Sequence, residues 1–151
     1  MIRRFINSLI TREQNTSSLA SACALGIFVA FSPFVGLHTV MAIGLSWLLS
    51  LNFVIVFSVT HFINNPWTMV PVYSFGYFTG EFILNGIFGI DTIAANPAWM
   101  SYLNELLYSY TGLHGVSWWS FMLGGNLLGL AIAGMLYPIM KRFFSRLIPL
   151  K

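Results

Sequence analysis

Apolar residues dominate the chain and form segments that polar or helix-breaking residues separate. Residues 2–12 alternate between an apolar and a basic face at helical spacing, so residues 1–14 are predicted to form a basic amphipathic helix. Such a helix is typical of a membrane interface. A basic flank that only fixes the topology of a membrane protein fits the pattern equally well.

A polar break at Asn15–Ser18 supplies N-cap residues and predicts a helix that runs to Phe31. Pro33 then interrupts it, because proline lacks a backbone donor, and Gly36 adds flexibility. Residues 18–31 alone would be about 21 Å long, which is too short to cross a bilayer. The pattern fits either a kinked long helix or two half-helices in a re-entrant hairpin.

A second helix is predicted from Gly36 to Ser50, with Asn52 at its end, and a short apolar segment follows from Phe53 to Ile63. A second helix break comes next, where Asn65 reads as an N-cap before a proline at the first helical position. A new helix is therefore expected from Pro66 towards Leu84, and Pro71 is a candidate kink within it.

The region 85–117 reads as an excursion that leaves the apolar core and contains one aromatic-rich helix. Asn96-Pro97 predicts its start and Gly112 its end. The last long apolar segment covers 118–140, and a basic amphipathic tail, 141–151, follows it.

Small residues recur at four-residue spacing, which allows close approach of helices in lipid. The sets are Ala22, Gly26 and Ala30; Gly76 and Gly80; and Gly125, Gly129 and Ala133. Together with the small size of the chain, these faces favour a homodimer.

These segments predict an all-α integral membrane protein with about four membrane-embedded helical segments, broken or re-entrant at Pro33 and Pro66 and flanked by amphipathic interfacial helices. We expect a single membrane domain over residues 1–151. Its parts are the amphipathic helix 1–14, a core 17–84 that holds both breaks, the excursion 85–117, the last span 118–140 and the basic tail 141–151.

Composition and charge support a membrane location. Hydrophobic residues make up 57% of the chain and charged residues only 7%, whereas soluble domains average about 25% charged. All seven basic residues lie at the two ends, and the acidic residues of the interior fall between Glu81 and Glu105. The positive-inside rule then predicts cytoplasmic termini and an even number of crossings. The net charge of +3 is explained by topology, so no nucleic-acid partner is expected.

The two break motifs carry a resemblance to a known family. Over Gly26 to Gly80 the chain resembles the bacterial membrane family known as domain of unknown function 2062, and this likeness implies a small protein of the bacterial inner (cytoplasmic) membrane without implying an activity. The family often has a basic residue shortly before the position of Asn52, where this chain has Ser50 and Leu51. The matching residues are Pro33, Gly36, His38, Asn52, Asn65, Pro66, Thr68, Pro71, Tyr73 and Gly80.

The breaks are also the candidate binding site. Helix N-termini offer free N–H groups and partial positive charge, so two such ends facing each other would attract a phosphate or carboxylate. The alternative is that the prolines are structural kinks and that the Asn and Thr side chains only cap the freed backbone. The candidate ligand-binding residues are Ser32, His38, Thr39, Asn64, Asn65 and Thr68.

His61 and Glu81 are candidates for a proton-linked role, because ionisable residues within membrane segments are often functional. The alternatives are a neutral histidine hydrogen-bonded between helices and a glutamate that simply ends a span. We expect no metal site and no cofactor, since the chain has one cysteine and no histidine pair at i, i+4 spacing. No catalytic motif is found, so an enzyme is not expected.

The leading hypothesis is therefore a small transporter or lipid translocator with an anion or phosphate site at the helix breaks. Its expected partners are membrane lipids and an anionic small molecule or lipid phosphate. The alternative is a non-catalytic structural or partner-binding membrane protein that assists envelope lipid or glycan metabolism.

Overall fold

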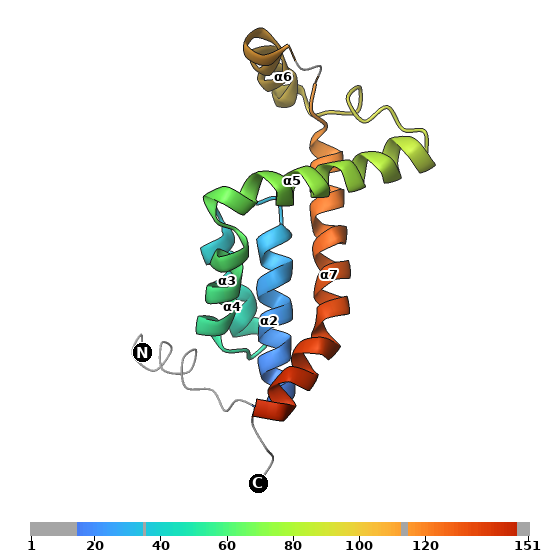
Figure 1. Cartoon of the computed structure of the whole chain (residues 1–151). Helices are drawn as coiled ribbons and strands as arrows, with labels where there is room; N and C mark the ends of the chain where they lie inside the picture. The colour runs from blue at the N-terminus through green and yellow to red at the C-terminus, as the bar shows by residue number, and fades with distance from the viewer. Residues whose placement is uncertain (1–14, 35, 113–114, 148–151) are drawn as a thin grey trace.

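The structure is a computed structural model that describes residues 15–34, 36–112 and 115–147 (Figure 1). The described residues are helical and contain no strand, as the sequence predicts. The predicted helix 1–14 and the last residues of the tail, 148–151, lie outside them. The helices are α2 (Thr16–Phe31), α3 (His38–Leu48), α4 (Phe53–Ile63), α5 (Pro66–Glu81), the π-helix η1 (Phe82–Ile87), α6 (Ala98–Thr111) and α7 (Trp118–Leu147).

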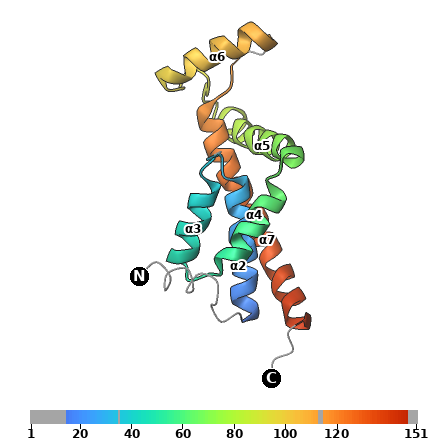
Figure 2. The same ribbon diagram turned by 90° about the vertical axis from the view of Figure 1, so that its left-hand side faces the viewer.

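Four helices run roughly along one axis, and α5 lies across them near one end (Figures 1 and 2). Along this axis α2 and α4 run in one direction and α3 and α7 in the other. The central helix is α2, which packs against α7 and α4, while α5 packs against α7. The helix α6 lies beyond α5, at the end of the molecule away from the start of α2 and the end of α7 (Figure 1).

The first break is a reversal of the chain and not a kink in a long helix. Asn15 caps α2 as predicted, since its side-chain oxygen accepts from the Ser18 backbone N–H at 2.7 Å. The helix ends at Phe31, Ser32 is extended, and Gly36 has a φ of +86°, a conformation that favours glycine. The next helix, α3, then runs antiparallel to α2 (Figure 2).

The second break has the predicted cap. Asn65 and Thr68 form a capping box, with Pro66 as the first helical residue of α5. Two boundaries differ from prediction. The helix α3 ends at Leu48, and Asn52 is not at its end but caps α4, accepting from the Val54 backbone N–H at 2.9 Å.

Glycines bring α5 and α7 into backbone contact. A methyl group at Gly76 would lie 3.1 Å from Gly125 Cα, and one at Gly80 would overlap the Ser120 carbonyl group. On another side of α7, a methyl group at Gly129 would lie 2.8 Å from Phe31 Cβ of α2. The predicted small-residue faces therefore pack within one chain, so they no longer argue for a homodimer.

The segment beyond α5 is tied to the start of α7 by amide side chains. Asn96 was expected to cap α6, but Pro97 holds that position. Asn96 instead donates to Val116 O at 2.9 Å and accepts from Trp118 N at 2.8 Å. Gly112 ends α6 in the left-handed conformation, as predicted.

The last helix is longer than the predicted span. It begins at Trp118 and continues past Met140 to Leu147, so the described part of the basic tail extends the same helix. At 30 residues it is about 45 Å long. Among the described helices, α7 alone is long and apolar enough to cross a membrane, while α2, α3 and α4 are apolar but shorter.

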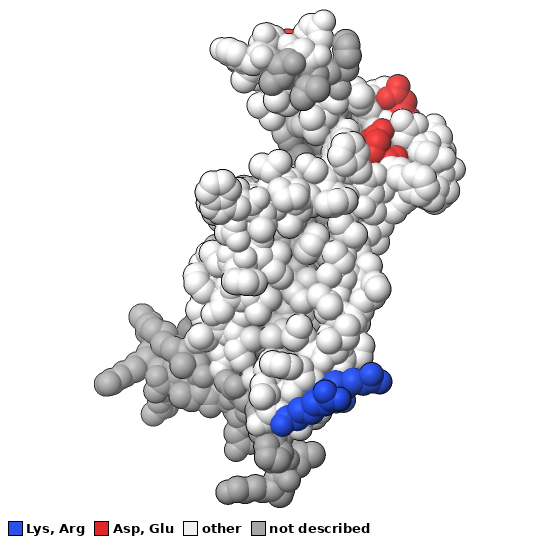
Figure 3. Space-filling model, viewed as in Figure 1, with Lys and Arg blue, Asp and Glu red and all other residues white. Residues whose placement is uncertain are grey.

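Charged side chains lie at opposite ends of the molecule (Figure 3). The described Lys and Arg residues, Lys141, Arg142 and Arg146, lie at one end, and Glu81 and Asp91 lie towards the other. Large apolar side chains are exposed between these ends, among them Phe62 at 82% and Trp67 at 91%. Many other large apolar side chains of the described helices are exposed as well.

Candidate functional site

The two helix breaks meet at one place, and polar side chains meet there. His38, the first residue of α3, is buried at 7% exposure. Its Nε2 lies 3.0 Å from Ser32 O, in the first break. Because a carbonyl oxygen can only accept, this hydrogen bond puts a proton on Nε2 and leaves Nδ1 as an acceptor in the neutral ring.

Asn64, at the end of α4, and Tyr73, in α5, complete this cluster. Asn64 Nδ2 donates to the Tyr73 hydroxyl at 2.9 Å and lies 3.4 Å from both ring nitrogens of His38. The Tyr73 hydroxyl is 3.3 Å from His38 Nε2. We call Ser32, His38, Asn64 and Tyr73 the junction cluster.

One polar atom of the junction cluster has no partner. Asn64 Oδ1 is buried and accepts no hydrogen bond from any described residue. An unsatisfied buried acceptor costs about 1–3 kcal/mol. A donor group that reached Asn64 Oδ1 would recover that energy.

A pocket of about 260 Å³ adjoins the cluster. It is bounded by the N-terminal ends of α3 and α5 and by the last turn of α4. The predicted meeting of two helix N-termini is therefore present. The lining residues are Gly36, His38, Thr60, His61, Asn64, Asn65, Pro66 and Met69.

Two of the predicted site residues serve mainly as caps. The Asn65 side chain accepts from the Trp67 and Thr68 N–H groups at 3.0 and 3.1 Å and donates to Phe62 O at 2.9 Å. The Thr68 hydroxyl donates to Ile63 O. The capping alternative thus describes both side chains, although Asn65 also borders the pocket.

Ser32 and Thr39 behave differently from each other. Ser32 is fully buried, and its hydroxyl points to Met41 Sδ at 3.8 Å, so its carbonyl oxygen is what reaches the cluster. Thr39 is exposed and does not line the pocket. The structure therefore brings only some of the six candidate ligand-binding residues together, around His38 and Asn64.

The candidate list omitted Tyr73 and Thr60. The Thr60 hydroxyl donates to Gly26 O of α2 at 3.0 Å and to Val56 O at 2.8 Å, so it joins α2 to α4 beside the pocket. Tyr73 stands two turns after Pro66 in a segment without charges. A buried tyrosine hydroxyl usually needs a hydrogen-bond partner. A tyrosine in this apolar segment could therefore have been predicted to join a polar cluster.

The candidate proton-linked residues lie apart from each other. His61 is exposed, bonds Phe57 O of its own helix at 3.0 Å and borders the pocket, so the histidine buried between helices is His38. Glu81 is at the other end of α5.

Glu81 forms a second polar cluster, between the end of α5 and the start of α7. Its Oε2 accepts from Ser120 at 2.7 Å and Thr92 at 3.0 Å, and its Oε1 accepts from Asn85 at 3.0 Å. Burial raises the pKa of this carboxyl, but the three hydrogen bonds together outweigh it and bring the pKa below its ordinary value. Glu81 is therefore a well-bonded carboxylate at neutral pH.

Metal binding has no candidate centre in the described part of the chain, which contains no group of three His, Cys, Asp or Glu side chains that could hold an ion.

The described residues form an all-helical fold with one helix long and apolar enough to cross a membrane and a polar junction where two helix breaks meet. Residues 1–150 match the family described as an uncharacterized protein conserved in bacteria, DUF2062, and the chain belongs to this family. The resemblance seen over Gly26 to Gly80 is thus confirmed and extends over nearly the whole chain. No curated protein and no solved structure matches the chain.

Proposed function

We propose that this protein lies in the bacterial inner membrane, with both termini in the cytoplasm, and binds a phosphate monoester at the junction cluster as a small transporter or lipid translocator. The observation that carries the proposal is the buried acceptor Asn64 Oδ1 beside a pocket, in a chain whose described Lys and Arg side chains lie at one end and whose described Asp and Glu side chains lie towards the other. The proposed role is binding, without catalysis.

The charge pattern and α7 support the membrane part of the proposal. With basic residues at one end and acidic residues at the other, the apolar exposed surface between them fits the hydrocarbon layer. Both the start of α2 and the end of α7 are at the basic end (Figure 1). This arrangement agrees with cytoplasmic termini.

The depth of the junction supports re-entrant helices. A methyl group at Gly125 would lie 2.8 Å from Phe31 O, so the first break is level with Gly125. Along α7 this level is about 10 Å from Trp118 and about 24 Å from Lys141. Helices of 11 residues such as α3 and α4 are about 17 Å long. They would enter from the cytoplasmic side, reach the junction and stop short of the outer surface.

Phosphate monoester chemistry suits the groups at the junction. The N-terminal ends of α3 and α5 contribute partial positive charge, although Asn65 already occupies the first N–H groups of α5. Asn64 Oδ1 needs a donor. A phosphate monoester has a second pKa near 6, so its monoprotonated form carries both a negative charge and an O–H donor, whereas a phosphodiester has no such proton.

The test compares lipids and free phosphate on one purified protein. Native mass spectrometry would measure binding of phosphatidic acid, phosphatidylglycerol and inorganic phosphate to the parent chain, to Asn64→Ala and to His38→Gln. We expect phosphatidic acid or inorganic phosphate to bind in preference to phosphatidylglycerol, and both variants to lose that preference. The first ligand would indicate a lipid substrate and the second a soluble one.

A matched control is Thr79→Ala, which removes a hydroxyl that donates to Phe75 O within α5, away from the pocket. This variant should bind like the parent. If neither phosphate monoester nor free phosphate is preferred, or if the Asn64 variant binds as the parent does, the proposed ligand is wrong.

The second candidate is a structural or partner-binding membrane protein that assists envelope lipid or glycan metabolism. The complete bonding of Asn65 and Thr68 within the second break favours it, since these side chains stabilise backbone without needing a ligand. Under this alternative, Asn64→Ala would change thermal stability and leave every ligand measurement unchanged.

A further inference from the structure

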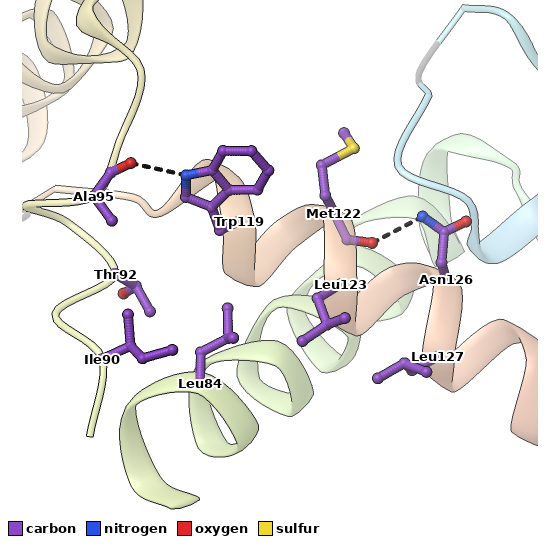
Figure 4. Close-up of a pocket in the computed structure, with 9 residues that line it drawn as sticks. All are labelled: Leu84, Ile90, Thr92, Ala95, Trp119, Met122, Leu123, Asn126 and Leu127. Carbon is purple, nitrogen blue, oxygen red and sulfur yellow. Dashed lines mark hydrogen bonds between the residues drawn. The ribbon is translucent and has the colours of Figure 1, made fainter. Parts of the chain in front are cut away.

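An apolar groove runs along the N-terminal half of α7, from Trp119 to Leu127 (Figure 4). Its volume is about 580 Å³, within the range of about 300–1,000 Å³ that small-molecule sites occupy. It lies between α7, η1 and the segment that follows η1. The lining residues are Leu84, Ile90, Thr92, Ala95, Trp119, Met122, Leu123, Asn126 and Leu127.

Three side-chain donors of the groove wall are already bonded to the protein. Trp119 Nε1 donates to Ala95 O at 2.8 Å, and Asn126 Nδ2 donates to Met122 O at 2.8 Å (Figure 4). The Thr92 hydroxyl donates to Glu81. The groove therefore presents mainly hydrocarbon to an occupant.

Two carboxylates stand at the edge of this groove. Glu81 is bonded to the groove residue Thr92, and Asp91 lies between Ile90 and Thr92 in sequence. The described Lys and Arg residues are at the opposite end of α7 (Figure 3). Two neighbouring negative charges thus border an apolar groove without a described basic side chain near them.

We propose that the groove holds one hydrocarbon tail of a membrane lipid whose headgroup carries a primary ammonium, and that the ammonium lies beside Glu81 and Asp91. This inference depends on the membrane location proposed above but not on the ligand of the junction cluster. The junction is at the opposite end of α5 from Glu81.

Headgroup chemistry decides which lipid is held. Lipid tails are as apolar as the groove, so tail packing alone gives little preference among lipids. A carboxylate has about four acceptor sites, and Glu81 uses three of them for Ser120, Thr92 and Asn85. One site is left for a donor from outside the protein.

Asp91 can supply a second contact to the same headgroup. Its Oδ1 accepts from the Ile93 and Ala94 N–H groups at 3.2 and 3.0 Å, and the residue is exposed. A primary ammonium has three N–H donors and can bond both carboxylates with charge-assisted hydrogen bonds. A trimethylammonium headgroup has the same charge but no N–H donor, and an anionic headgroup would be repelled.

The experiment is lipid competition on the full chain in nanodiscs of equal parts phosphatidylethanolamine, phosphatidylcholine and phosphatidylglycerol with identical tails. Lipids retained after release from the nanodisc would be counted by native mass spectrometry. We expect enrichment of phosphatidylethanolamine over phosphatidylcholine by about threefold to fivefold, the size expected of a partly exposed ion pair. Equal retention of all three lipids would mean ordinary boundary lipid and would overturn the proposal.

The variants separate headgroup from tail. Asp91→Asn should reduce the enrichment and the pair Glu81→Gln with Asp91→Asn should abolish it, while Glu105→Gln, an exposed carboxylate on α6, should leave it unchanged. Leu127→Trp, at the groove wall, should lower retention of every lipid. Enrichment that survives in the double variant would refute the role of the carboxylates. Phosphate binding at the junction, measured on the same double variant, should stay as in the parent.

Discussion

The crossing of α5 over α7 predicts a graded response to adding one methyl group. At Gly80 the new methyl group would overlap the Ser120 carbonyl, and backbone atoms cannot rotate away from it. At Gly76 it would lie 3.1 Å from Gly125 Cα, so a shift of a few tenths of an ångström would accommodate it. At Gly134, on α7, no atom lies within 4 Å.

The expected free energies of unfolding follow this order. Gly134→Ala should stabilise by about 0.5–1 kcal/mol, because alanine is the better helix former. Gly76→Ala should be close to neutral, since the same gain offsets a small repacking cost. Gly80→Ala should destabilise by about 1–3 kcal/mol or more, the usual cost of overpacking.

The assay is equilibrium unfolding of the three variants and the parent in one detergent, followed by tryptophan fluorescence. Trp118 and Trp119 begin α7, close to the crossing, and should report its loss. The same fluorescence transition should appear by circular dichroism if the helices unfold together. Equal midpoints for Gly80→Ala and Gly134→Ala would refute the described crossing.

Three further changes test other contacts. Thr60→Val keeps the side-chain shape but removes the hydrogen bond to Gly26 O, and should lower the free energy of unfolding by about 1 kcal/mol. Thr79→Val removes a hydroxyl that bonds only within α5 and should lower the free energy of unfolding by less. Asn65→Ala removes the cap of α5 and should cost about 0.5–2 kcal/mol in denaturant unfolding; an unchanged midpoint would contradict the capping role. The pKa of Glu81 is lowered in the folded protein, so its stabilisation is present above the ordinary glutamate pKa and is lost as pH falls through the folded value. Melting curves between pH 6 and 3 should therefore fall more steeply for the parent than for Glu81→Gln.

Local rules predicted the helix starts and breaks well. Asn65 caps the helix that it was expected to cap, and Asn15 lies in the segment Asn15–Ser18 that was expected to cap α2, because a cap depends on residues within one turn. Pro33 ends α2 for an equally local reason. The direction of the chain after that break was not predictable, since it depends on packing against α2 and α4.

The errors occurred where the local signal was ambiguous. Asn52 follows an apolar run and precedes another, so the same residue fits a helix end and a helix start. The basic residues after Met140 suggested a separate tail, yet Lys and Arg are good helix formers and α7 continues through them. Hydropathy marks where the environment changes, and it does not mark where a helix ends.

The candidate site was predicted in part for a similar reason. His38 and Asn64 were chosen because they supply polar side chains at the two helix breaks, and they do lie together. Tyr73 was missed as a binding residue because it is 35 positions from His38 and joins it only after α4 and α5 change direction. Glu81 was predicted to have a proton-linked role. Nothing in the sequence indicated that Ser120, Thr92 and Asn85 would donate hydrogen bonds to it.

The position of α7 in the chain has a consequence for synthesis. Both α2 and α5 pack against it, yet a ribosome produces residues 118–147 after both of them. Until those residues emerge, Gly80 has no opposing backbone and Glu81 has no Ser120 hydroxyl to accept from. The helices α2, α3 and α4 can pack with one another before then, but α5 and one side of α2 must wait for α7. We expect chains stalled before Trp118 to be degraded rapidly and to be rescued when the missing segment is supplied as a separate peptide.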